Sequence, residues 1–137
     1  MPASLRFDAD LRSLKHIRRA MIDAATQIGA RRDSIDDVVY AANELISNTI
    51  TYGYGNQAGP IWIDIWQEGD TLYVSIRDTA PVFDPRSVPL PRNLVKRGQQ
   101  RTGGLGLFLT RYLLDDLQHR PLPGGGNELR LIKRRAF

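Results

Sequence analysis

Glu44 and Asn48 are four residues apart in a stretch whose apolar spacing predicts a helix. Their side chains therefore lie one turn apart on one stripe of that helix. An amide oxygen can ligate a hard cation such as Mg²⁺, and a carboxylate can take a proton from an attacking hydroxyl. The stripe lies roughly 130° from the centre of the apolar face, so an ordinary solvated helix face is the alternative.

Asp78 is a second candidate, because it ends an alternating strand and is followed by Thr79, Ala80 and Pro81. A carboxylate at a strand end can accept a hydrogen bond from an exocyclic amine of a flat ligand. The small side chain of Ala80 lets the backbone turn away close to such a ligand. A strand end with an Asx-type turn is the alternative.

The third candidate is a glycine-rich stretch that leads into an apolar helix: Thr102, Gly103, Gly104, Leu105, Gly106 and Leu107. Glycines let backbone N–H groups approach an anion at the positive end of the helix dipole. The dipole contributes only about 0.3–1 kcal/mol per charge, so phosphate binding there needs several N–H bonds and Mg²⁺ as well. A glycine-rich hinge is the alternative. The sequence has neither a P-loop nor a G-x-G-x-x-G motif after its first strand, so any nucleotide is bound by another scaffold.

Three stretches with the period of amphipathic helices must position these residues: residues 11–28, residues from about 33 to 53, and residues 105–117. Gly29 and Gly53 are expected to end the first two helices. Asp33 or Ser34 is the expected N-cap of the second.

Alternating stretches predict a short first strand over residues 5–7 and a hairpin of residues 61–66 and 72–76. A closing strand is expected over residues 128–134, with one further strand before it over residues 118–122. This order does not give alternating βαβ units. It predicts an α+β sandwich with helices on one face of a mixed, mostly antiparallel sheet. Residues 79–102 contain four prolines and little periodicity, which in a small domain is typical of a functional lid or a disordered segment.

Length and composition narrow the function classes. The 137 residues predict a single domain over residues 1–137, and the absence of cysteine excludes disulfides, zinc–thiolate sites and thiol nucleophiles. No apolar run is long enough to cross a bilayer and the N-terminus has no apolar signal region, so we expect a cytoplasmic protein without a membrane partner. The net charge of +4 permits an anionic partner, but the scattered basic residues predict no direct binding to nucleic acid.

In this order and spacing, the three candidates resemble the N-box, G1-box and G2-box of the Bergerat (GHKL) ATP-binding superfamily. The chain most resembles its short bacterial branch, the anti-sigma-factor serine kinases of the RsbW and SpoIIAB type. Residues 43–54 are similar to the branch's E-x-x-x-N helix with its following Gly-Tyr. Residues 103–109 are similar to its G-G-L-G-L helix start, and residues 125–131 to its closing strand. The resemblance covers nearly the whole chain.

The resemblance implies ATP and Mg²⁺ as cofactors and a Bergerat fold. The residues that it implies to contact them are Asn48, Asp78, Ala80, Arg101, Thr102, Gly103, Gly104, Leu105, Gly106 and Leu107. Within that set, Asn48 would ligate the metal, Asp78 would bind the adenine amine, and residues 104–107 would hold the phosphates. Residues from about 85 to 102 would form a lid. Glu44 would be the general base for an acceptor serine.

The function that the resemblance implies is an ATP-dependent serine-protein kinase that also sequesters a sigma factor or another regulator. Its substrate would be a serine of a STAS-domain anti-anti-sigma protein, and the kinase would form a homodimer. Two positions depart from the pattern, because Ala80 stands where the G1-box usually has glycine and Tyr52 where the N-box often has histidine. A partner-binding switch that closes on ATP without phosphate transfer is the alternative function.

Overall fold

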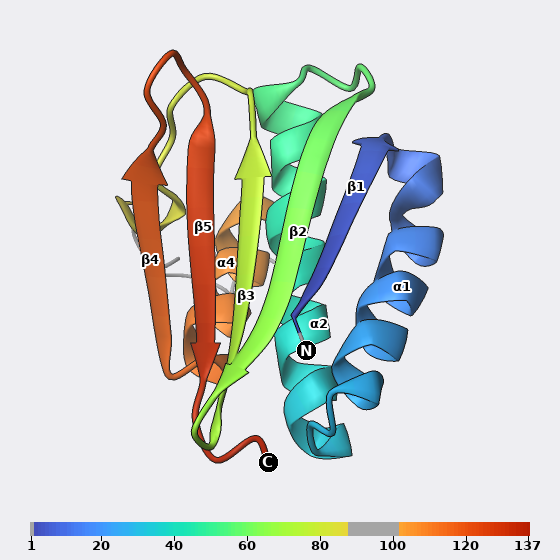
Figure 1. Ribbon diagram of the computed structural model, residues 1–137. Helices are drawn as coiled ribbons and strands as arrows, with labels where there is room; N and C mark the ends of the chain where they lie inside the picture. The colour runs from blue at the N-terminus through green and yellow to red at the C-terminus, as the bar shows by residue number, and fades with distance from the viewer. Residues whose placement is uncertain (1, 88–101) are drawn as a thin grey trace.

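The computed structural model describes residues 2–87 and 102–137, with the backbone alone for residues 102–105. The described strands form one sheet in the order β1-β2-β3-β5-β4: β1 (Ala3–Ala9), β2 (Gly59–Glu68), β3 (Thr71–Asp78), β4 (Asp116–Pro121) and β5 (Asn127–Lys133). Every pairing between these strands is antiparallel. Three α-helices cover one face of the sheet (Figure 1): α1 (Leu14–Gln27), α2 (Arg32–Asn48) and α4 (Thr102–Leu113). The predicted α+β class and the one-sided helix layer are confirmed.

The core lies between the sheet and these helices. Along β2, the alternating Ile61, Ile63 and Ile65 are fully buried, and α2 contributes Leu45 and Ile46 to the same cluster. Burying each such side chain stabilises the fold by about 1.5–3 kcal/mol. This packing fixes α2 against the sheet and so sets the direction in which its polar stripe points.

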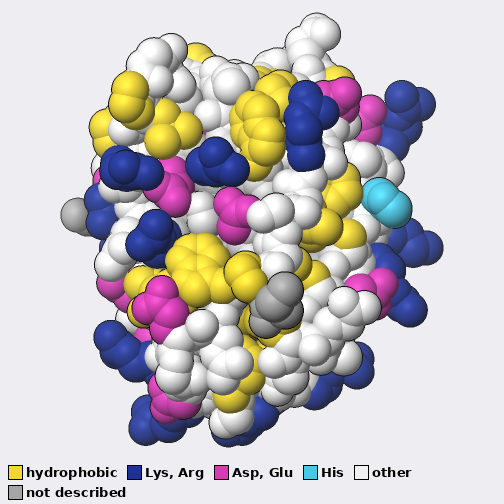
Figure 2. Space-filling view, in the orientation of Figure 1, with side chains coloured by type: hydrophobic (Ala, Val, Ile, Leu, Met, Phe, Trp, Pro, Cys, Tyr) yellow, Lys and Arg dark blue, Asp and Glu magenta, His cyan; other side chains and the backbone are white. Residues whose placement is uncertain are grey.

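The opposite face of the sheet has no helix over it in the described part of the chain. Figure 2 shows hydrophobic side chains there among Lys, Arg, Asp and Glu. Trp66 stacks on Tyr73 with ring centroids 5.2 Å apart, and the Arg130 guanidinium lies 5.4 Å from the Trp66 ring. The Arg77 guanidinium carbon lies over the Trp62 ring in the same way, 5.8 Å from the ring centroid. The aromatic rings on this face are therefore half-covered by their own neighbours.

The first two helices end at Gly29 and Gly53 as predicted, but the predicted N-cap of α2 is wrong. Gly29 follows the first helix with φ +95°, a conformation that glycine adopts at little cost, and a single π-turn carries α2 on through Thr49–Gly53. Neither Asp33 nor Ser34 is the N-cap, because α2 begins at Arg32. The Asp33 carboxylate instead lies in the first turn, where it accepts bonds from the Ser34 N–H and the Arg31 guanidinium.

The predicted helix over residues 105–117 is wrong at both ends. The helix begins at Thr102 and ends at Leu113, and Leu117 belongs to strand β4, opposite Leu131 of β5. The Lys133 ammonium donates to the Leu113 carbonyl at 2.6 Å and so satisfies one of the free acceptors at the helix end. Leu117 fits a helix period as well as a strand period, so its spacing alone did not distinguish the two.

The predicted lid over residues 85–102 falls almost wholly outside the described residues. Its first part forms a 3-10 turn at Pro85–Ser87, held by the Asp84 carboxylate, which accepts from the Arg86 N–H at 2.9 Å. Residues 88–101, including Arg101, are not described. No helix within the described ranges combines the length and hydropathy of a membrane span.

Candidate functional site

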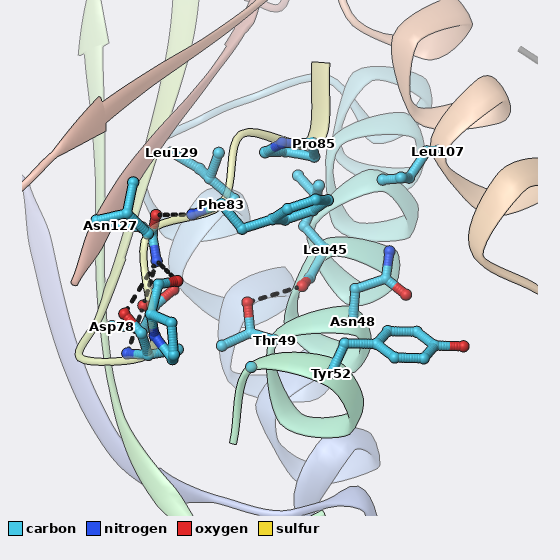
Figure 3. Close-up of a pocket in the computed structure, with 14 residues that line it drawn as sticks. Leu45, Asn48, Thr49, Tyr52, Asp78, Phe83, Pro85, Leu107, Asn127 and Leu129 are labelled. Carbon is cyan, nitrogen blue, oxygen red and sulfur yellow. Dashed lines mark hydrogen bonds between the residues drawn. The ribbon is translucent and has the colours of Figure 1, made fainter. Parts of the chain in front are cut away.

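A cavity of about 380 Å³ opens between α2 and the ends of β3 and β5 (Figure 3). Side chains from every neighbouring element line it, among them Leu45, Asn48, Asp78, Phe83, Leu107 and Leu129. The lining is mostly apolar, with a small number of polar groups. Such a cavity suits a flat ligand that has a polar edge.

Asp78 supplies the buried carboxylate of this cavity. It ends β3 and is only 2% exposed. Its Oδ1 accepts hydrogen bonds from the Ala80 N–H at 3.0 Å and from the Asn127 amide at 2.9 Å. Burial raises the pKa of Asp78, and these two bonds oppose that shift. The carboxylate is therefore held in one orientation, with hydrogen-bonding capacity left for a ligand.

Ala80 lies against Gly53, and the two residues fit each other by size. Ala80 is 4% exposed and lines the cavity. A Cβ placed on Gly53 would lie 2.8 Å from the Ala80 methyl, which is closer than carbon atoms pack. The glycine at position 53 thus makes room for an alanine where the G1-box usually has glycine. Nearby, the Tyr54 hydroxyl accepts from the Thr79 N–H at 2.9 Å and fixes the same turn.

Replacing Gly53 with alanine is expected to lower the free energy of unfolding by about 1–3 kcal/mol, because the new methyl overpacks against Ala80. Combining Gly53→Ala with Ala80→Gly removes the collision and is expected to restore most of that loss. Urea denaturation of the two single variants and the double variant measures this coupling. Strictly additive effects would show that the two residues do not constrain each other.

Glu44 and Asn48 lie on the side of α2 that faces α4. Both side chains are half-buried, and Asn48 lines the cavity. A Cβ on Gly106 would collide with Glu44 Oε1, so the glycine admits the carboxylate beside the α4 backbone. Burial and the Glu44 carboxylate raise the pKa of Tyr40, one turn earlier on the stripe. Glu44 and Asn48 are therefore partly covered between the two helices, whereas Tyr40 on the same stripe is exposed.

No described residue forms a hydrogen bond or ion pair with the Glu44 carboxylate or the Asn48 amide. This contrasts with Asn43 on the same helix, whose amide oxygen accepts from Arg18 at 3.2 Å. A carboxylate and an amide one turn apart, both without partners among the described residues and the amide at the cavity, are available to a ligand.

The start of α4 brings the glycine-rich stretch to the same region. Thr102, Gly103, Gly104 and Leu105 form the first turn of the helix, whose N–H groups have no partner within the helix. Gly106 follows beside Glu44, and the Leu107 side chain is buried in the cavity wall. Asn48, Asp78, Ala80 and Leu107 thus line one cavity. Glu44 and Gly106 contact each other outside its lining, and Arg101 lies outside the described residues.

Asn127 is a polar residue of this site that sequence reasoning missed. It is 4% exposed at the start of β5, and its amide donates to Asp78 and, at 3.1 Å, to the Pro81 carbonyl. Its oxygen accepts from the Phe83 N–H at 2.9 Å (Figure 3). Asn127 thereby holds the turn after β3 against the floor of the cavity. An asparagine directly after three glycines at a strand start was the only available signal.

The chain matches the family model of the histidine kinase-like ATPase domain over residues 7–133. The chain is 24% identical over 109 residues to an anti-sigma F factor of Thermoanaerobacter sp. (strain X514), which covers 80% of this chain and 76% of that protein. It is 30% identical over 108 residues to the serine-protein kinase RsbW of Oceanobacillus iheyensis, covering 74% of this chain and 67% of that protein.

Solved structures that share this fold include two that match nearly the whole of this chain. One contains the RsbU and RsbW domains of Rv1364c from Mycobacterium tuberculosis, with a TM-score of 0.68 and 20% identity over 98% of this chain. This chain spans only 32% of that longer one. The histidine kinase AdeS of Acinetobacter baumannii matches with a TM-score of 0.51 and 13% identity over 97% of this chain. The predicted resemblance to the RsbW type is confirmed at the level of sequence and fold.

Proposed function

The chain belongs to the histidine kinase-like ATPase domain family, and on this basis we propose that it is an ATP- and Mg²⁺-dependent serine-protein kinase. In this proposal it sequesters a sigma factor or a similar regulator and phosphorylates a serine of a STAS-domain anti-anti-sigma protein. The observation that carries the proposal is the Glu44 carboxylate, unpaired among the described residues and packed beside Gly106, one turn from Asn48 at the cavity. The names of the anti-sigma F factor and RsbW relatives support it.

The cavity fits an adenine ring by its chemistry. The side chains of Leu45, Leu107 and Leu129 supply apolar walls for the ring faces. Two hydrogen bonds already reach Oδ1 of Asp78, so we expect Oδ2 to accept from the exocyclic amine. Ala80, backed by Gly53, leaves the ring room at the turn after β3.

The region between α2 and the start of α4 fits the phosphates and a hard cation. Asn48 would hold Mg²⁺ by its amide oxygen, and the phosphates would accept from the N–H groups in the first turn of α4. Mg²⁺ would neutralise charge on the phosphate oxygens. No group of three or more His, Cys, Asp or Glu side chains that could hold a metal occurs among the described residues, so most ligands would come from phosphate and water.

Glu44 is the residue that we assign to the transfer step. It would accept the proton from the serine hydroxyl as that oxygen attacks the γ-phosphorus, while ADP leaves with the bridging oxygen. Its place next to Gly106 puts it at the start of α4, where the γ-phosphate would lie. We further propose that residues 1–137 act as one domain and that the kinase works in the cytoplasm as a homodimer.

Transfer of labelled phosphate tests the proposal. The protein is incubated with γ-labelled ATP, Mg²⁺ and STAS-domain proteins encoded in the same genome, and label is expected on a serine of one of them. Replacement of that serine by alanine serves as the control. Binding of ATP without transfer to any STAS-domain protein would overturn the kinase assignment and favour a partner-binding switch.

A further inference from the structure

A buried histidine outside the cavity is attached to the residues that organise it. His119 lies on strand β4, where its side chain is only 5% exposed. Its Nε2 is 2.8 Å from the amide oxygen of Asn127 on the neighbouring strand. His119 does not line the cavity around Asp78, so any effect it has on a ligand there acts through Asn127.

The hydrogen bonds of Asn127 define which ring nitrogen of His119 carries a proton. The Asn127 amide nitrogen faces three acceptors, Asp78 Oδ1 and the carbonyls of Ala80 and Pro81, so it must be the donor end of that side chain. Its oxygen therefore accepts both from the Phe83 N–H and from His119, and Nε2 of the imidazole bears hydrogen. The bonds form a directed chain from His119 through Asn127 to Asp78.

The other ring nitrogen of His119, Nδ1, faces Asp84 in the segment that follows β3. His119 Nδ1 lies 3.9 Å from Asp84 Oδ2, and Asp84 is itself held by Arg86, whose side chain donates to it at 2.8 Å. The imidazole thus has a hydrogen-bond partner in Asn127 and lies near the Asp84 carboxylate on its other side. Rotation of the ring about the Cβ–Cγ bond would break the hydrogen bond to Asn127. This bond therefore holds the imidazole in its orientation between Asp84 and Asn127.

We infer that His119 is a positioning residue for nucleotide recognition: it holds the Asn127 amide, which in turn aims the Asp78 carboxylate and pins the turn that contains Pro81 and Phe83. The inference rests on the proposed function, in which Asp78 accepts from adenine. Without a donor at position 119, the Asn127 amide has one bond fewer to fix its rotation, and Asp78 loses part of its alignment. The consequence is weaker discrimination between adenine and a base that lacks the exocyclic amine.

Nucleotide titration of three variants tests this role. His119→Leu removes the donor at similar size, whereas His119→Gln places an amide nitrogen where it can still donate to Asn127. The control is Gln118→Leu, an exposed neighbour on the same strand. Affinities of the intact protein for Mg²⁺–ATP and Mg²⁺–ITP are measured by calorimetry, and melting temperatures are recorded in parallel. ITP carries an oxygen where ATP carries the amine.

We expect His119→Leu to reduce the ratio of ATP to ITP affinity about fivefold, the contribution of one hydrogen bond, and His119→Gln to keep it within about twofold. Should the leucine variant not fold, His119→Asn takes its place, because its amide is one methylene too short to reach Asn127. An unchanged ratio in the variant without the donor would overturn the inference. Absence of ATP binding in the unmutated protein would instead overturn the proposed function, so the two failures are distinguishable.

Discussion

Replacing Glu44 with alanine is expected to lower the rate of phosphate transfer roughly 10²- to 10⁴-fold while ATP affinity stays nearly unchanged. The carboxylate is the proposed acceptor of the serine proton, and it does not line the cavity that we assign to adenine. Removing it should therefore affect the transition state far more than the bound nucleotide. Single-turnover transfer of labelled phosphate, with calorimetric ATP affinity measured on the same preparation, separates the two effects.

Asp36→Ala is the matched control for this variant. Asp36 is an exposed carboxylate on the same helix, paired with Arg32 at 3.2 Å, and it has no contact with the cavity. Its loss should change neither transfer nor ATP affinity by more than about twofold, because exposed ion pairs contribute little. Transfer at the unmutated rate in Glu44→Ala would remove Glu44 from the proton-accepting role.

The second large effect is expected at Asp78. In Asp78→Asn, the amide oxygen can keep the bonds from the Ala80 N–H and Asn127, while the amide nitrogen takes the place of Oδ2. That nitrogen donates, so it faces the adenine amine donor to donor. We expect ATP affinity to fall roughly 10- to 100-fold, the range for a lost hydrogen bond to a charged group.

The same substitution should improve the relative binding of ITP, whose exocyclic carbonyl oxygen can accept from the new amide. Parallel calorimetric titrations of Asp78→Asn with ATP and ITP measure the change in preference, and circular dichroism confirms the fold. Equal losses for both nucleotides would show that Asp78 supports the cavity without contacting the base.

Much of the architecture was predictable because local periodicity and core packing agree. The isoleucines of β2 alternate in the sequence and are buried on one face, and the apolar stripe of α2 packs against them. The order of the last elements was harder. Leu113 and Leu117 fit both a helical and an extended period, and only the pairing of β4 with β5 separates them.

The site was predictable in its residue types and less so in its contacts. Glu44, Asn48 and Asp78 were identifiable because their side chains and spacing suit a phosphate and base site. Glu44 is half-buried because α4 packs along α2. No local sequence pattern encodes that contact between the two helices. Asn127 and His119 act through the cross-strand neighbours of β3, β4 and β5, and those pairings join residues far apart in the sequence.

Calorimetric titration of Mg²⁺–ATP into the intact protein and into Asn48→Ala tests the central claim, that a metal-bound triphosphate lies between α2 and the start of α4. Asn43→Ala is the matched control, since its amide lies on the same helix but bonds to Arg18. We predict saturable binding by the unmutated protein and by Asn43→Ala, and at least about tenfold weaker binding by Asn48→Ala, the loss of one ligand to the metal. No heat at millimolar nucleotide with Mg²⁺ present, or identical isotherms for Asn48→Ala and the unmutated protein, would contradict the claim.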